Sequence, residues 1–157
     1  MNAIIEIIND SSANWVPDQQ LCENWIHRTL QAVTLEGGHN ISIRFVESQE
    51  SCELNGHYRG NRSATNVLSF PASFPTAFSK QIEHIPLGDI VICPEVLEKE
   101  AATQDKTLQA HWAHLTIHGL LHLLGYDHES EESAEIMEGL EISTLESLGF
   151  PNPYLIV

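Results

Sequence analysis

The segment 107–124 constrains the fold most, because its apolar residues lie on most sides of the helix that it predicts. A helix with this pattern has no polar face to offer to solvent, so it must be buried on nearly every side. Its apolar residues are Leu108, Trp112, Leu115, Ile117, Leu120, Leu121 and Leu124. The rest of the chain is therefore expected to pack around this helix.

The other segments predict strands first and helices later in the chain. Strands are predicted over 3–8, 41–45, 66–70 and 88–93, and helices over 18–34, 48–56, 94–102 and 130–149, by hydrophobic period and by turn residues. Ser48 is a candidate cap for the second helix, Gly56 its end, and 71–86 a long loop. This order predicts an α+β fold, with a single layer of about four strands packed against about five or six helices.

Length and composition narrow the class of protein. A chain of 157 residues fits a single domain over 1–157. The start MNAIIEIIND has no basic region or cleavage site, and no apolar run is long enough to span a membrane, so a cytoplasmic protein is expected. Cys22, Cys52 and Cys93 form no CxxC motif and are expected to be small buried residues in a reducing compartment.

The charge distribution limits where an anion can bind. A net charge of −15 argues against a protein that coats nucleic acid non-specifically, since there are only 7 Lys and Arg residues. The segment 54–82, however, contains Arg59, Arg62 and Lys80 and no Asp or Glu. It is the expected anion-facing surface, although a polar loop that happens to lack acids explains the same composition.

Histidines interrupt the apolar helix in a pattern that predicts a metal site. His118 and His122 are four residues apart, so their imidazoles project from one face on successive turns. On a continuing helix His128 would point elsewhere, but Gly125 can adopt a left-handed conformation and let the chain return His128 to the pair. Three imidazoles suit zinc, and they also accept nickel, copper or iron.

A site of three histidines favours catalysis over a structural role. Structural zinc sites are normally closed by four protein ligands, so three leave a position for water, whose pKa the metal lowers for hydrolysis. His111 and His114 are interpreted as hydrogen-bonded neighbours of the site. Asp127 either orients a ligand imidazole or is a turn residue.

The substrate class depends on Gly119 and Arg59. The ligand spacing is that of the zinc-peptidase motif HExxHxxGxxH, but Gly119 stands where that motif has its general base, which disfavours a peptidase. A phosphodiester instead requires positive charge on its nonbridging oxygens, and Arg59, followed by Gly60, is the candidate. An ordinary surface arginine is the alternative for Arg59.

Several motifs together resemble the YbeY family of bacterial endoribonucleases over nearly the whole chain. These motifs are HGLLHLLGYDH at 118–128, ATNVLSFP at 64–71, LGDIVIC at 87–93, YRG at 58–60 and HWAH at 111–114. The family often has an Asp and a Lys just after the RG dipeptide, whereas this chain has Asn61, Arg62 and Ser63.

The resemblance implies a single-strand-specific, metal-dependent endoribonuclease. Its role would be maturation of the 3′ end of 16S rRNA and ribosome quality control. It further implies the ligands His118, His122 and His128, and Arg59 as the functional basic residue. The small ribosomal subunit would be its partner, with a ribosomal protein or a GTPase as further candidates. A ribosome-assembly factor with a mainly structural metal and a zinc peptidase-like hydrolase remain as alternatives.

Overall fold

A computed structural model of the chain describes residues 3–73 and 83–155. Its elements are β1 (Ala3–Asn9), α1 (Gln19–Ala32), β2 (His39–Phe45), α2 (Ser48–Arg59), β3 (Val67–Pro71), β4 (Ile85–Ile92), α3 (Pro94–Thr103), α4 (Leu108–Leu123) and α5 (Glu131–Ser147). The predicted α+β fold is confirmed, with four strands and five helices among the described residues.

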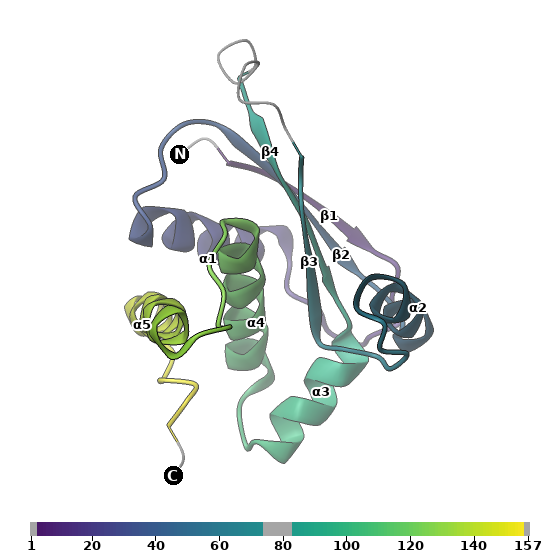
Figure 1. Cartoon of the computed structure of the whole chain (residues 1–157). Helices are drawn as coiled ribbons and strands as arrows, with labels where there is room; N and C mark the ends of the chain where they lie inside the picture. The colour runs from purple at the N-terminus through teal and green to yellow at the C-terminus, as the bar shows by residue number, and fades with distance from the viewer. Residues whose placement is uncertain (1–2, 74–82, 156–157) are drawn as a thin grey trace.

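The four strands form one sheet in the order β1-β2-β4-β3. β1, β2 and β4 are parallel, whereas β3 runs antiparallel to β4 and forms an edge of the sheet. The predicted alternation in β2 is confirmed, because Ile41, Ile43 and Phe45 are buried on one face. Helices α1, α4 and α5 lie on this side of the sheet and α2 lies on the other (Figure 1). On the α2 side, Leu54 packs against Leu68 and Val91.

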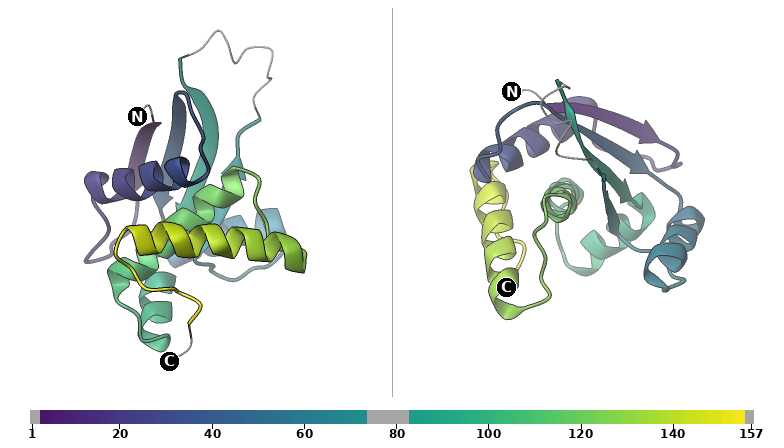
Figure 2. Two further views of the ribbon diagram at one scale, coloured as in Figure 1. Left: turned by 90° about the vertical axis from the view of Figure 1, so that its left-hand side faces the viewer. Right: turned by 45° about the horizontal axis from the view of Figure 1, so that its top comes forward.

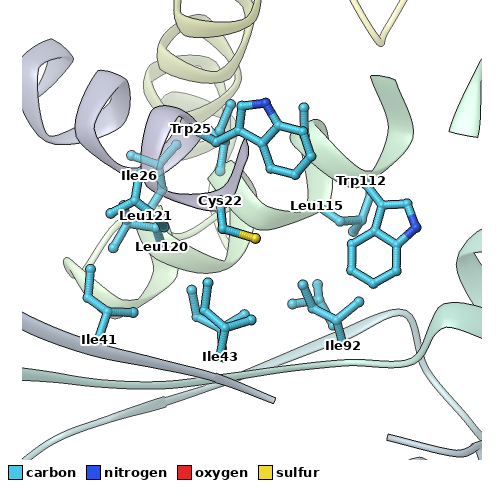
Figure 3. Packing of buried hydrophobic residues seen from close by; sticks show 14 of the residues in the cluster. Cys22, Trp25, Ile26, Ile41, Ile43, Ile92, Trp112, Leu115, Leu120 and Leu121 are labelled. Carbon is cyan, nitrogen blue, oxygen red and sulfur yellow. The ribbon is translucent and has the colours of Figure 1, made fainter. Parts of the chain in front are cut away.

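Helix α4 is buried as its sequence predicts. It contacts β3 and β4 on one side and α1, α3 and α5 on the others, so α5 is separated from the sheet by α4 (Figure 2). Trp112, Leu120 and Leu121 are fully buried, and Trp112 meets Phe45 edge-on with ring centroids 4.9 Å apart. Figure 3 shows how side chains of α4 and α1 meet the isoleucines of the sheet. The sheet and α1 therefore hold the helix that carries the histidines.

The prediction for the second helix was wrong at both ends. Ser48 is the first helical residue and Glu47 is the N-cap, which makes no capping hydrogen bond from its side chain. The helix continues past Gly56 to Arg59 and ends at Gly60, which has a φ of 72°. The amide of Gly60 donates to the carbonyl of Gly56 at 3.1 Å, so the left-handed residue that closes the helix is Gly60.

Strand β4 begins earlier than predicted. Ile85 and Pro86 already pair with β2. The register of this pairing shifts between Asn40 and Ile41 of β2, so an irregularity of the bulge type lies within the paired part of β4. Gly88 has a φ of 139°, and a Cβ there would lie 2.3 Å from the carbonyl oxygen of Phe70. The predicted loop 71–86 is correspondingly shorter, and its residues 74–82 lie outside the described part of the chain.

The three cysteines were predicted to be buried. Cys22 and Cys93 are buried, whereas Cys52 is only half-buried, and all three are free thiols. Among residues 3–73 and 83–155, none of the helices combines the length and the apolar character that crossing a bilayer requires.

Candidate metal centre

Helix α4 and the turn after it bring three histidines together. The Nε2 atoms of His118 and His122 are 3.1 Å apart on successive turns of the helix. Gly125 then adopts a φ of 96°, and its amide donates to the carbonyl of His122 at 3.1 Å. The chain reverses there, and the ring of His128 lies with its centroid 5.7 Å from that of His118 and 5.2 Å from that of His122. One ligand atom from each histidine lies within 4.8 Å of the other two.

Hydrogen bonds on the far side of two rings determine which nitrogens face one another. Nδ1 of His122 lies 3.0 Å from the carbonyl oxygen of Tyr126, and Nδ1 of His118 lies 3.2 Å from a carboxylate oxygen of Glu141. Both partners only accept, so each Nδ1 carries the proton and donates it. The Nε2 atoms of neutral imidazoles then present lone pairs to the same space. The arrangement suits a cation between them.

The spacing fits a zinc-sized ion. Two nitrogens bound to a tetrahedral zinc at roughly 2.0–2.1 Å lie about 3.3 Å apart, close to the 3.1 Å between the Nε2 atoms of His118 and His122. The pKa of His122 is lowered by burial first, and then by the nearby charges of His118, His128 and Arg59. A lowered pKa keeps this imidazole neutral, which is the form that binds metal. This group of histidines could therefore hold a metal ion.

Glu141, a carboxylate beside the histidine cluster, was not predicted from the sequence. It lies on α5, and its side chain is 1% exposed. Burial alone would raise the pKa of this carboxyl, but hydrogen bonds from His114 and His118 outweigh burial and lower the pKa to about 2. The sequence contained a signal, since Met137, Glu141 and Leu145 share one face of the helix. An acid in an apolar stripe requires a partner.

The other candidate residues around the site separate into neighbours and turn residues. Nε2 of His111 lies 2.9 Å from Glu100, so His111 is a hydrogen-bonded neighbour, as expected. His114 is also a neighbour, because its Nε2 lies 2.5 Å from Glu141. Of the two interpretations of Asp127, the structure shows the turn residue, since its carboxylate accepts from the amide of Glu129 at 3.3 Å. The carboxylate that contacts a ring of the histidine cluster is Glu141 instead, 3.2 Å from Nδ1 of His118.

Close packing explains why no carboxylate occupies position 119. A Cβ on Gly119 would lie 2.9 Å from Cγ2 of Ile90 and 3.1 Å from Cγ2 of Val67, so this side of α4 lies directly on the sheet. The carbonyl of Gly119 accepts a hydrogen bond from Ser69 at 2.8 Å. A glutamate at this position would displace the strands, and its carboxylate would be directed at the sheet.

Arg59 stands exposed at the C-terminal end of α2. Its charge is near enough to contribute to the lowered pKa of His122. Within the described residues it takes part in no ion pair, unlike Arg44, which pairs with Asp10 and Glu50. Its guanidinium therefore carries an uncompensated positive charge in the neighbourhood of the histidines.

A cavity of about 330 Å³ opens beside His118. Its wall combines a cation, a carboxylate, amides and aromatic rings. They include Asn66, Glu100, Gln104, Lys106, His114, His118 and Tyr154. A larger cavity of about 620 Å³ lies along α2, but Glu47, Glu50 and Glu53 line it, and this charge opposes the binding of an anion. The cavity beside His118 shares this residue with the histidine cluster.

Known proteins match the chain over most of its length. A family model described as "Endoribonuclease YbeY" matches residues 6–149. Two curated relatives carry the same name, from Xanthomonas axonopodis pv. citri (strain 306) and Xanthomonas campestris pv. campestris (strain B100). They are 48% and 46% identical over 139 residues, which is 88% of this chain and 85% of each relative. A solution structure of a Thermotoga maritima protein matches 93% of this chain and 92% of its own, with a TM-score of 0.57 and 27% identity.

Proposed function

The chain belongs to the YbeY endoribonuclease family, and from this premise we propose that it is a metal-dependent endoribonuclease of single-stranded RNA. The observation that carries the metal dependence is the convergence of the Nε2 atoms of His118 and His122 with the ring of His128. We propose these three histidines as the ligands, with zinc as the preferred ion and nickel as the alternative.

The residues of the site suit phosphodiester hydrolysis better than peptide hydrolysis. A bound divalent ion would lower the pKa of a water molecule and polarise a phosphoryl oxygen. Arg59 would neutralise the negative charge that grows on the nonbridging oxygens, since its guanidinium offers a planar pair of donors. Gly119 lies against the sheet and supplies no general base, which argues against the peptidase alternative.

The cavity beside His118 supports a preference for single strands. Its volume of about 330 Å³ can admit a nucleotide whose base has left the stack, and Tyr154, a residue that is 41% exposed, lines it. Proteins recognise single-stranded RNA by stacking unpaired bases on aromatic side chains and by bonding their edges. A duplex keeps its bases stacked and offers none of them to this cavity.

The biological substrate that we propose is the 3′ end of 16S rRNA, in maturation and in ribosome quality control. The small ribosomal subunit would be the partner, and a ribosomal protein or a GTPase could present the RNA. A net charge of −15 fits this setting, because a protein with so few cations gains little non-specific affinity for RNA and depends on the exposure of a particular strand. We place the protein in the cytoplasm.

A comparison of RNA substrates tests the proposal. The zinc-loaded protein should cleave a single-stranded oligoribonucleotide at least about 10-fold faster than the same strand in a perfect duplex, because only the single strand offers unstacked bases. The cleavage rate of each labelled strand is the measurement, and His118→Ala controls for contaminating nuclease. Equal cleavage of both substrates would refute the strand preference. Equal cleavage by His118→Ala, or no cleavage at all, would refute the nuclease.

A further inference from the structure

A fully buried carboxylate joins one histidine of the cluster to two other parts of the fold. One oxygen of Glu141 accepts from Nδ1 of His118 at 3.2 Å. The other oxygen lies 2.5 Å from Nε2 of His114 and 2.6 Å from the hydroxyl of Tyr154. Both carboxylate oxygens are thus bonded, and Glu141 is the acceptor that three side chains share.

The bond to His118 decides which ring nitrogen faces the other histidines. A carboxylate that accepts from Nδ1 keeps the proton there, leaves Nε2 free and fixes the orientation of the ring. The negative charge also makes the imidazole a better ligand, because it stabilises the positive charge that the ring acquires on binding metal. Removing this carboxylate would leave His118 free to turn and to change tautomer.

Tyr154 brings the segment after α5 into the same network. This segment turns back after the helix (Figure 2). The hydroxyl of Tyr154, thirteen positions after Glu141 in the chain, donates to its carboxylate at 2.6 Å. Its ring meets His114 edge-on with centroids 5.4 Å apart. Its amide donates to the side chain of Asn152 at 2.8 Å, which holds the turn. Together these contacts restrain the carboxylate on the side away from His118.

We propose that Glu141 is the positioning residue of His118 and that Tyr154 supports Glu141 in this role. The proposal rests on the metal site of the proposed function. It makes α5 and the C-terminal segment part of the metal centre, although neither contributes a ligand. The affinity for metal then depends on a residue well separated in sequence from the histidine motif.

A second ion at Glu141 is the competing interpretation. His114, His118 and Glu141 offer ligand atoms that lie within 4.8 Å of one another. The same atoms, however, are joined to one another by direct hydrogen bonds of 2.5 Å and 3.2 Å. An ion would have to replace both bonds. The positioning role therefore predicts one zinc ion per chain, and a ligand role predicts two.

Zinc affinity and the tautomer of His118 test this inference. The full-length protein is stripped of metal and titrated with zinc against a chelator of known affinity, and the ring nitrogens are followed by ¹⁵N NMR. Glu141→Gln should weaken zinc binding about 10–100-fold and mix the tautomers of His118. Tyr154→Phe should weaken it on the order of several-fold. Glu135→Gln, an exposed residue of the same helix, is the matched control and should bind like wild type.

The possible outcomes separate the failure of this inference from that of the metal site. Wild-type affinity and an unchanged tautomer in folded Glu141→Gln would overturn the positioning role and leave the metal site intact. Two zinc ions per wild-type chain would also overturn it, because Glu141 would then be a ligand. No zinc binding by wild type would refute the metal site itself. If circular dichroism shows that Glu141→Gln is unfolded, Tyr154→Phe decides, and wild-type affinity in that variant overturns the proposal.

Discussion

Replacing His122 with alanine is expected to abolish zinc binding and to lower RNA cleavage by roughly 1,000-fold or more, because two histidines cannot hold the ion in a catalytic geometry. The protein should remain folded. His122 is half-buried, and the apolar core of α4 packs without it, so the unfolding free energy of the metal-free protein should change by about 1 kcal/mol or less. Zinc content, thermal unfolding without metal and cleavage rate are the three measurements.

A matched control and the alternative function make this prediction specific. His27→Ala removes another half-buried histidine from a helix, outside the cluster, and should leave zinc content and cleavage unchanged. An assembly factor with a structural metal predicts instead that His122→Ala unfolds. A folded His122→Ala protein that cleaves at the wild-type rate would contradict the catalytic site.

Reversing the charge of Arg59 is expected to lower cleavage by about 100–1,000-fold, because glutamate repels the phosphoryl oxygens that arginine would stabilise. Zinc content and thermal stability should stay near the wild-type values, since Arg59 is exposed and takes part in no ion pair within the described residues. The measurement is the cleavage rate of a single-stranded RNA by the zinc-loaded variant Arg59→Glu.

Lys99→Glu controls for the change in net charge. Lys99 is exposed and pairs with Glu95 on α3, and it belongs to neither the histidine cluster nor the cavity beside His118. Its replacement by glutamate changes the net charge by the same amount. It should reduce cleavage far less than Arg59→Glu does. If Arg59→Glu cleaves as fast as wild type, Arg59 is an ordinary surface arginine and the proposed role is wrong.

The central features of the fold were predictable from local patterns. The apolar residues of α4 required burial on most sides, and the structure places the helix between the sheet and the other helices. Gly125 was predicted to adopt a left-handed conformation and return the chain toward the histidine pair, and its φ of 96° confirms that conformation. Both inferences needed only helical geometry and the conformational freedom of glycine.

The errors arose where a contact with another segment of the chain decides the structure. Gly56 looked like a helix end, but the space for a Cβ there is taken by the side chain of Arg62, 2.8 Å away, and the chain turns at Gly60. The start of β4 depends on pairing with β2, which the sequence of either strand alone does not show. Strand order depends on the same kind of non-local pairing.

For the same reason, only part of the site could be predicted from the sequence. Three histidines on one helix and one turn follow from local geometry, whereas Glu141 and Tyr154 reach the site from α5 and the segment after it. Only the position of Glu141 on a buried helix face hinted at its role. The metal ligands, the role of Arg59 and the single domain over 1–157 stay predictions that experiments must test.

The most direct test of the central claim is cleavage of single-stranded ribosomal RNA by the purified protein before and after metal removal. We predict that stripping the metal with a chelator abolishes cleavage, that added zinc restores it, and that zinc restores nothing in His118→Ala. Cleavage that continues unchanged in the stripped, metal-free protein would contradict a metal-dependent nuclease at this site.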